Sequence, residues 1–191
     1  MMLAAVVLSL LVQGSASVSG LAITVDDRVQ VYPVRGATAN ELWEQIHLSG
    51  PQEGSHGKRF AGKTKWHITW HYWFRSDGQS CRVERSEVAF SSVTTLPVCS
   101  DPVHGSPGLQ AEWKAFISRL KEHEAGHRSN GMRAAITVRR IVDAAVPTAD
   151  CRRLGSTIDS SARAALARAN HADIDYDATT EHGQTQGAVL P

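Results

Sequence analysis

The spacing of apolar residues changes about halfway along the chain, and this change limits which folds the chain can adopt. From about Leu21 to Cys99, apolar and polar residues mostly alternate, which is typical of strands that bury one face. From about Leu109 to Asn170, apolar residues recur at helical spacing and form one buried stripe. Strands followed by helices predict an α+β fold.

The first half predicts a small antiparallel sheet with one helix packed against it. A strand is expected over residues 28–34, and a capping box at Thr38–Glu41 begins a short amphipathic helix. Residues 65–75 are the clearest strand, because five apolar side chains fall on one face. These five are Trp66, Ile68, Trp70, Tyr72 and Phe74.

A hairpin is expected after this strand. Asp77-Gly78 is a turn signal, and the return strand should run from about Cys81 to Thr94, with Leu96-Pro97 ending it. Its apolar phase shifts between Val83 and Val88, which predicts a β-bulge.

The second half predicts two helices. The first is long: it begins near residue 109, and Pro147 stops it. The second is expected over about residues 156–170. The final segment, residues 173–191, has the composition of turns.

The composition is that of a single globular domain. The chain has 191 residues, of which 42% are hydrophobic and 20% are charged. Its formal net charge is +1, which gives no sign of a surface for nucleic acid or lipid headgroups. We therefore expect no nucleic-acid partner and, for the mature protein, no membrane; the oligomeric state is not indicated.

The N-terminus predicts an export signal. Residues 1–12 are almost wholly apolar, and small or polar residues follow. This pattern predicts a signal peptide over residues 1–22 and a secreted or periplasmic protein, although no Lys or Arg precedes the apolar run. A buried N-terminal strand or helix is the alternative. The mature part would be one domain over 23–191, mainly strands in 23–100, and helices with a tail in 108–191.

The clearest chemical signal is His-Glu-Ala-Gly-His at residues 123–127. His123 and His127 are four apart on a predicted helix, so both imidazoles can bind one Zn²⁺. Glu124 is angled to the same side, where it can serve as general base toward a water that the metal acidifies. Leu120 and both histidines share one core-facing row. The alternative is two core histidines bonded to their neighbours, with Glu124 solvated.

A catalytic zinc site needs a third protein ligand. The metzincin extension would place a histidine at position 133, where the chain has Arg133. Asp159 on the second helix is possible, and His171 lies at the end of that helix. The best candidate is His182, because Gly126 would leave room for the tail to approach the first helix. The alternative is that His182 is an exposed tail residue.

Two more histidines belong to the aromatic strand. His67 and His71 lie on one face but roughly 13 Å apart, since a strand rises about 3.3 Å per residue. They cannot share a metal, and we expect half-exposed sheet positions for both.

The chain contains three cysteines, Cys81, Cys99 and Cys151. In an exported protein, one disulfide could form and one thiol would remain; spacing leaves all three pairings open. Because no two cysteines have close C-x-x-C spacing, a thiolate metal site is not expected.

Ten stretches spread over most of the mature chain resemble a known bacterial family. They are Gly62–Trp66, Cys81, Leu96-Pro97, Trp113 with Phe116, the motif at 123–127, Cys151, Tyr176-Asp177, Thr180, His182-Gly183 and Gln186-Gly187. In these stretches the chain is similar to the domain of unknown function 922 family, described as predicted secreted zinc-dependent proteases.

The resemblance implies a metal site at His123 and His127 with Glu124, and it makes the tail around His182 part of that site. It also implies a Cys81–Cys151 disulfide. Cys99, which would be left over, departs from the family pattern.

Together these features predict a secreted zinc-dependent metallopeptidase that acts on peptides or proteins. Zn²⁺ would be held by His123, His127 and His182, with Glu124 as general base. Tyr176 is a candidate oxyanion donor if the tail folds back. The alternative is a non-catalytic exported binding module with a structural zinc, which would not need Glu124. A cell-wall amidase would keep the chemistry and change the substrate.

Overall fold

The computed structural model describes residues 10–11, 22–52, 57–99 and 106–190. The predicted signal peptide therefore lies almost wholly outside the described residues. From that segment the structure describes only residue 22 and strand β1 (Leu10–Leu11), which pairs antiparallel with β2.

The sheet has the strand order β1-β2-β4-β3, where β2 is Ile23–Val34, β3 is Lys63–Ser76 and β4 is Cys81–Cys99. Strands β3 and β4 form the predicted antiparallel hairpin, but β2 pairs parallel with β4. The sheet is therefore mixed, and the expectation of a wholly antiparallel sheet was wrong at this one pairing. Alternating apolar residues identify a strand, but they carry no information about the direction of its neighbour.

The β3–β4 hairpin contains the predicted bulge. The apolar residues at every second position of β3 face the helices. Among them Ile68 is buried, and Trp66 and Trp70 on either side of it are half-buried. Trp73 pairs with Arg85, but the next residue, Phe74, pairs with Val83, so the register of the two strands shifts at this point. This confirms the bulge predicted between Val83 and Val88.

Strand β4 extends past the expected end at Leu96-Pro97 and continues to Cys99. At that point β4 pairs with β2 alone, because β3 begins at Lys63, which pairs with Thr95. Pro97 lies beyond the part of β4 that pairs with β3, so its missing N–H costs no hydrogen bond to β3. Proline is tolerated where one edge of a strand is open.

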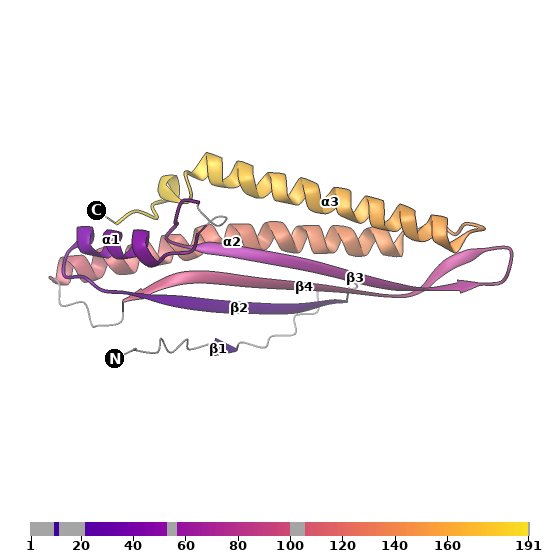
Figure 1. The fold of residues 1–191 in the computed structure, drawn as a ribbon, viewed down its shortest axis with the longest axis horizontal. Coiled ribbons are helices and arrows are strands. Elements are labelled where there is room, and N and C mark those ends of the chain that lie inside the picture. The colour runs from indigo at the N-terminus through magenta and orange to yellow at the C-terminus, as the bar shows by residue number, and fades with distance from the viewer. Residues whose placement is uncertain (1–9, 12–21, 53–56, 100–105, 191) are drawn as a thin grey trace.

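Two long helices, α2 (Pro107–Asp143) and α3 (Cys151–Thr180), lie side by side along one face of the sheet. Figure 1 shows α3 above α2 in the view, with the strands below both. The Ser106 side chain caps α2 by accepting a hydrogen bond from Leu109 N, followed by Pro107 in the first turn. The expected start and end of α2 are thus close to those observed.

Helix α3 is much longer than the predicted span of 156–170. It begins at Cys151 behind the capping residue Asp150, and it continues to Thr180. Residues 173–180 were expected to be turn-like from their composition, which offers no apolar stripe. In the structure their polar side chains face other polar groups on α2, so an apolar stripe is not needed there.

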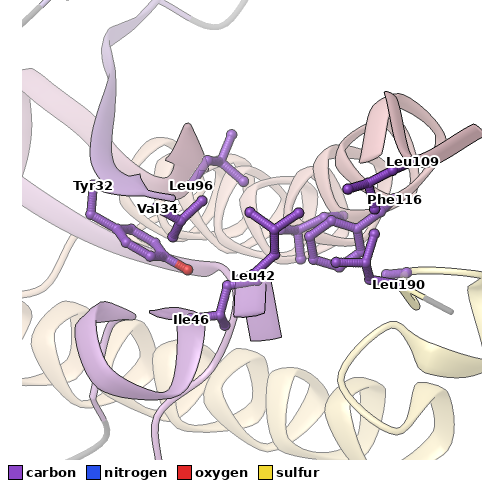
Figure 2. Packing of buried hydrophobic residues seen from close by; sticks show 10 residues of the cluster. Tyr32, Val34, Leu42, Ile46, Leu96, Leu109, Phe116 and Leu190 are labelled. Atoms are coloured by element: carbon purple, nitrogen blue, oxygen red, sulfur yellow. The ribbon is translucent and has the colours of Figure 1, made fainter. Parts of the chain in front are cut away.

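The short helix α1 (Ala39–Ser49) closes the end of the molecule near the C-terminal tail. Thr38 caps it as predicted, since its hydroxyl accepts from Glu41 N. Figure 2 shows Leu42 of α1 beside Phe116 of α2 and Leu190 of the tail, all in one buried cluster. Burying apolar side chains of this size stabilises the fold by about 1.5–3 kcal/mol each. Because Leu190 is one of them, the C-terminal tail contributes to the stability of the core.

Cys81 and Cys151 form a disulfide that joins β4 to the start of α3. This confirms the pairing that the family resemblance implied, with Cys99 as a free, partly buried cysteine. Among the helices that the structure describes, none is long and apolar enough to cross a membrane.

Candidate metal centre

The histidine motif lies in the interior, about midway along α2. His123, Glu124 and His127 are only 2%, 3% and 7% exposed. The Nε2 atoms of the two imidazoles are 3.3 Å apart. The spacing of four residues has thus brought both rings to one side of the helix, as expected.

The last turns of α3 lie opposite these histidines. Asp173, Tyr176 and Asp177 are three and four residues apart, so they share one side of that helix. Asp177 Oδ1 is 3.2 Å from His123 Nε2 and 3.0 Å from His127 Nε2. One carboxylate oxygen of α3 therefore meets both imidazoles of α2.

The three facing atoms have the spacing of metal ligands. Tetrahedral bonds of about 2.0–2.1 Å place neighbouring ligand atoms about 3.3 Å apart. The three distances within this group are 3.0, 3.2 and 3.3 Å. His123, His127 and Asp177 are the residues that could hold a metal ion in the described part of the chain.

The outer nitrogens of both rings are already bonded. His123 Nδ1 donates to Gln186 Oε1 at 2.9 Å, and His127 Nδ1 donates to Asp173 Oδ1 at 3.1 Å. A neutral imidazole that donates from Nδ1 presents a lone pair at Nε2. Two such lone pairs and a carboxylate oxygen repel one another unless a proton or a metal ion lies between them, and the chemistry of the donor set fits a metal.

Asp173 is itself held in place, which fixes the orientation of His127. Its carboxylate accepts hydrogen bonds from Trp66 Nε1 at 2.6 Å and from Asn130 Nδ2 at 2.7 Å. An imidazole that binds metal commonly donates its other nitrogen to a carboxylate in this way. Trp66 comes from β3, so the sheet also takes part in positioning the ligands.

The charges around the histidines favour a positive charge between them. Burial by itself would lower the pKa of His127, but hydrogen bonds to Asp173 and Asp177 and the charge of Glu124 raise it to about 10. Burial would raise the pKa of Asp177, yet its hydrogen bonds to His123 and His127 hold that pKa well below the usual range.

Glu124 is placed beside this group without being part of it. Its Oε2 is buried and has no hydrogen-bond partner among the described residues. Burial raises the pKa of Glu124 above its ordinary value, against the lowering influence of Thr64 and the two imidazoles. A buried carboxylate oxygen without a partner is costly to the fold, and such groups are characteristic of functional sites.

Two glycines make room for the site. A Cβ at Gly62 would lie 2.6 Å from Glu124 Oε1, so only glycine fits beside this carboxylate. A Cβ at Gly126 would lie 2.4 Å from the Tyr176 hydroxyl. Gly126 thus lets α3 come close to α2, which is the role expected of it, although helix α3 and not a loose tail occupies the space.

Tyr176 supports His123 from behind. Its ring stacks on the His123 ring at 5.0 Å between centroids, and its hydroxyl accepts a hydrogen bond from Gln186 Nε2 at 3.0 Å. It is not among the residues that line the cavity described below. Its proposed role as oxyanion donor therefore gains no support from this position.

His182 reaches the edge of the group but is not one of its three members. Its Nδ1 is 3.4 Å from Asp177 Oδ1, and its ring packs on Phe60 at 4.5 Å between centroids. Glu181 and His182 have φ of 48° and 54°, and Gly183 follows with φ of 90°. This left-handed turn directs the tail back along α2, so that Gln186 meets His123.

The other candidates lie elsewhere. Asp159 accepts hydrogen bonds from Trp70 Nε1 and the Tyr72 hydroxyl, and so it fastens α3 to β3. His67 and His71 are exposed on β3, on the face away from the helices.

Asp173, Asp177 and Gln186 were assigned no role in the site from the sequence, although Asp177 and Gln186 lie in stretches that resemble the family. A signal for the first two is present, because two carboxylates four apart on a helix mirror the two histidines. It was missed because the second helix was expected to end before residue 173.

A cavity of about 530 Å³ opens onto the group. His123, Glu124, His127 and Asp177 form one part of its wall, and the segment before β3 and residues of the tail form the rest. The three ligand atoms are therefore accessible to a small molecule or to part of a larger one.

The comparisons with known proteins identify a family. The sequence model of a bacterial protein family of unknown function, DUF922, matches residues 29–183. No curated protein and no solved structure shows significant similarity to the chain. Because the match covers most of the chain, including all three ligand positions and Glu124, the chain belongs to the DUF922 family of bacterial proteins of unknown function.

Proposed function

We propose that the protein is a zinc-dependent hydrolase that cleaves peptide bonds. The observation that carries the proposal is the combination of three ligand atoms at tetrahedral spacing with a buried carboxylate beside them, one oxygen of which has no hydrogen-bond partner among the described residues. Two imidazole nitrogens and one carboxylate oxygen are a donor set that suits zinc and that leaves a fourth position open.

His123, His127 and Asp177 would hold the metal, so Asp177 takes the place first assigned to His182. A zinc ion in such a site polarises a carbonyl oxygen and acidifies a water molecule. Glu124 lies on the cavity side of this group, where its raised pKa suits it to accept a proton and pass it to a leaving amine.

The decisive experiment compares wild type with Glu124→Gln. We expect about one zinc per chain in both proteins, cleavage of a broad peptide library by wild type, and a loss of at least about 100-fold in kcat/KM for the variant. Glu122→Gln is the matched control, since Glu122 is exposed on the same helix and its one side-chain partner among the described residues is Arg119. Wild type that binds zinc but cleaves no peptide would contradict the proposal.

A binding module with a structural zinc is the second candidate, and the position of His182 favours it. If His182 turned its imidazole inward, the site would have four protein ligands and no open position, as in structural zinc sites. The result expected for a structural site is unchanged zinc content in Glu124→Gln together with a large loss of zinc in His182→Ala.

We also propose that the protein acts outside the cytoplasm. The Cys81–Cys151 disulfide supports this, because disulfides persist in oxidising compartments. Fractionation of expressing cells tests it: protein found only in the cytoplasm, with both thiols reduced, would contradict export.

A further inference from the structure

The cavity beside the metal centre has walls of opposite charge. Its described lining includes three carboxylates, Glu124, Asp173 and Asp177, and all three belong to the metal centre or its immediate support. Its cations come from one short segment that leads into β3. They are Lys58, Arg59 and Lys63.

Two of these carboxylates, Asp173 and Asp177, are committed to other groups, and the third, Glu124, is buried at the metal centre. Asp177 contacts both imidazoles, and Asp173 accepts from His127, Asn130 and Trp66. Their charges are therefore matched within the centre. They are not available to attract a cationic ligand from the cavity.

The cations have no such partners. None of the three forms an ion pair with a carboxylate of the described residues: Lys58 lies over the Phe60 ring, Arg59 donates to Gly50 O, and Lys63 donates to Gln52 O. Positive charge without matching negative charge in a partly enclosed cavity attracts anionic ligands more strongly than the same charge on an open surface.

The rest of the lining is suited to a peptide. Apolar and aromatic side chains, among them Trp43, Phe60, Leu120 and Ile174, share the wall with these cations. Such a surface can take up the hydrocarbon part of a side chain while the cations meet its charged end.

From this arrangement we infer that the cavity selects peptides that carry an acidic side chain and places that side chain beside Lys58, Arg59 and Lys63. The inference rests on the proposed peptidase function for the identity of the ligand as a peptide. The selection itself depends only on the charges of the cavity, so it can be measured as binding, without turnover.

The experiment uses zinc-loaded Glu124→Gln and a neutral six-residue peptide in which Glu, Gln or Lys replaces each position in turn. Each peptide has the same uncharged fluorophore, and binding is followed by fluorescence anisotropy. At low salt we expect the best Glu peptide to bind about 10-fold more tightly than its Gln counterpart. This ratio should shrink severalfold at about 0.5 M salt, where charges are screened within about 4 Å.

Two double variants locate the effect. Lys58→Gln/Lys63→Gln should reduce the preference for Glu over Gln to less than about 3-fold. Lys65→Gln/Lys121→Gln removes the same charge from exposed residues of β3 and α2 outside the cavity, and it should leave the preference intact. Circular dichroism checks that both variants are folded.

The outcomes separate this inference from the proposed function. Equal binding of Glu and Gln peptides, or tighter binding of Lys peptides, overturns the inference even if wild type cleaves peptides. A preference for Glu that depends on Lys58 and Lys63 supports it even if wild type cleaves nothing, in which case the proposed peptidase fails. If zinc-loaded protein binds none of the peptides, both fail.

Discussion

Asp177 and His182 are five residues apart, yet the structure gives them different relations to the same two imidazoles. Asp177 Oδ1 lies within 3.2 Å of both Nε2 atoms, whereas the His182 ring contacts Asp177 and Phe60 and neither imidazole among the residues that the structure describes. The difference arises because Asp177 is on the inner side of a rigid helix, while His182 follows the left-handed turn that ends it. A ligand needs a fixed position, which a helix supplies better than a turn.

This contrast yields a prediction about zinc content. Asp177→Ala should weaken zinc binding by more than about 100-fold, because losing even an outer partner of a ligand commonly costs about 10- to 100-fold. His182→Ala should keep about one zinc per chain. Metal analysis after dialysis against a weak chelator measures both, and equal loss of zinc in the two variants would contradict the assignment of Asp177 as third ligand.

Single residues also show how far sequence could predict the site. His123, Glu124 and His127 were found because their chemistry and their spacing lie within one short segment. Asp177 was not found, because the second helix was expected to end before residue 173, so the helical pair of Asp173 and Asp177 went unnoticed. Only the packing of α3 on α2 brings Asp177 and the motif together.

At the scale of elements, α2 approaches both the sheet and α3 through its glycines. Helical glycine normally costs about 1 kcal/mol relative to alanine. At Gly131 a Cβ would lie 2.5 Å from Trp66 Cγ, and Trp66 is anchored to Asp173 by its indole N–H. The cost of glycine is therefore offset by the close contact it permits between α2 and β3.

Gly131→Ala should accordingly destabilise the protein, by about 1–3 kcal/mol as in overpacked cores, and not stabilise it as helix propensity alone predicts. Gly108→Ala near the start of α2 is the matched control, since a Cβ there meets only Ser106 Oγ at 3.6 Å. Urea unfolding of the metal-free proteins measures both changes. A more stable Gly131→Ala variant would show that Trp66 moves aside freely.

The elements themselves were largely predictable. Each expected strand and helix is present, and so is the bulge in β4, although β2 and α3 begin about five residues earlier than expected and β4 ends about five residues later. The end of α3 and the parallel pairing of β2 were not predicted, because both depend on a neighbour that is distant in sequence. Polar residues of α3 turn inward only because α2 presents polar groups to them.

At the scale of the whole molecule, the disulfide and the metal centre lie toward opposite ends of α3. Cys151 begins the helix and bonds Cys81, while Asp177, which contacts both imidazoles of α2, lies in the last turns. The disulfide and these contacts together hold α3 against the hairpin and α2 at both of its ends. The disulfide therefore limits separation of the start of α3 from the hairpin, and the contacts of Asp177 limit separation of its end from α2.

Removal of the disulfide should lower the free energy of unfolding by about 2–5 kcal/mol, since it closes a long loop in the unfolded chain; the two cysteines are 70 residues apart. The test compares urea unfolding of wild type and Cys81→Ser/Cys151→Ser, with Cys99→Ser as control. Zinc content of the folded double variant should stay unchanged. Loss of zinc on removal of the disulfide would show that the two ends of α3 are coupled.

Because residues of α3 and the tail complete the metal centre, the centre can form only after they have been synthesised and have folded. A growing chain would have made His123 and His127 before Asp173, Asp177 and Gln186, which follow them in the sequence. Until α3 and the tail have folded back onto α2, the site lacks its third candidate ligand and the hydrogen-bond partners of both imidazoles. Tight metal uptake would therefore wait until α3 packs on α2, and a chain shortened before residue 173 would remain without metal however well its sheet had formed.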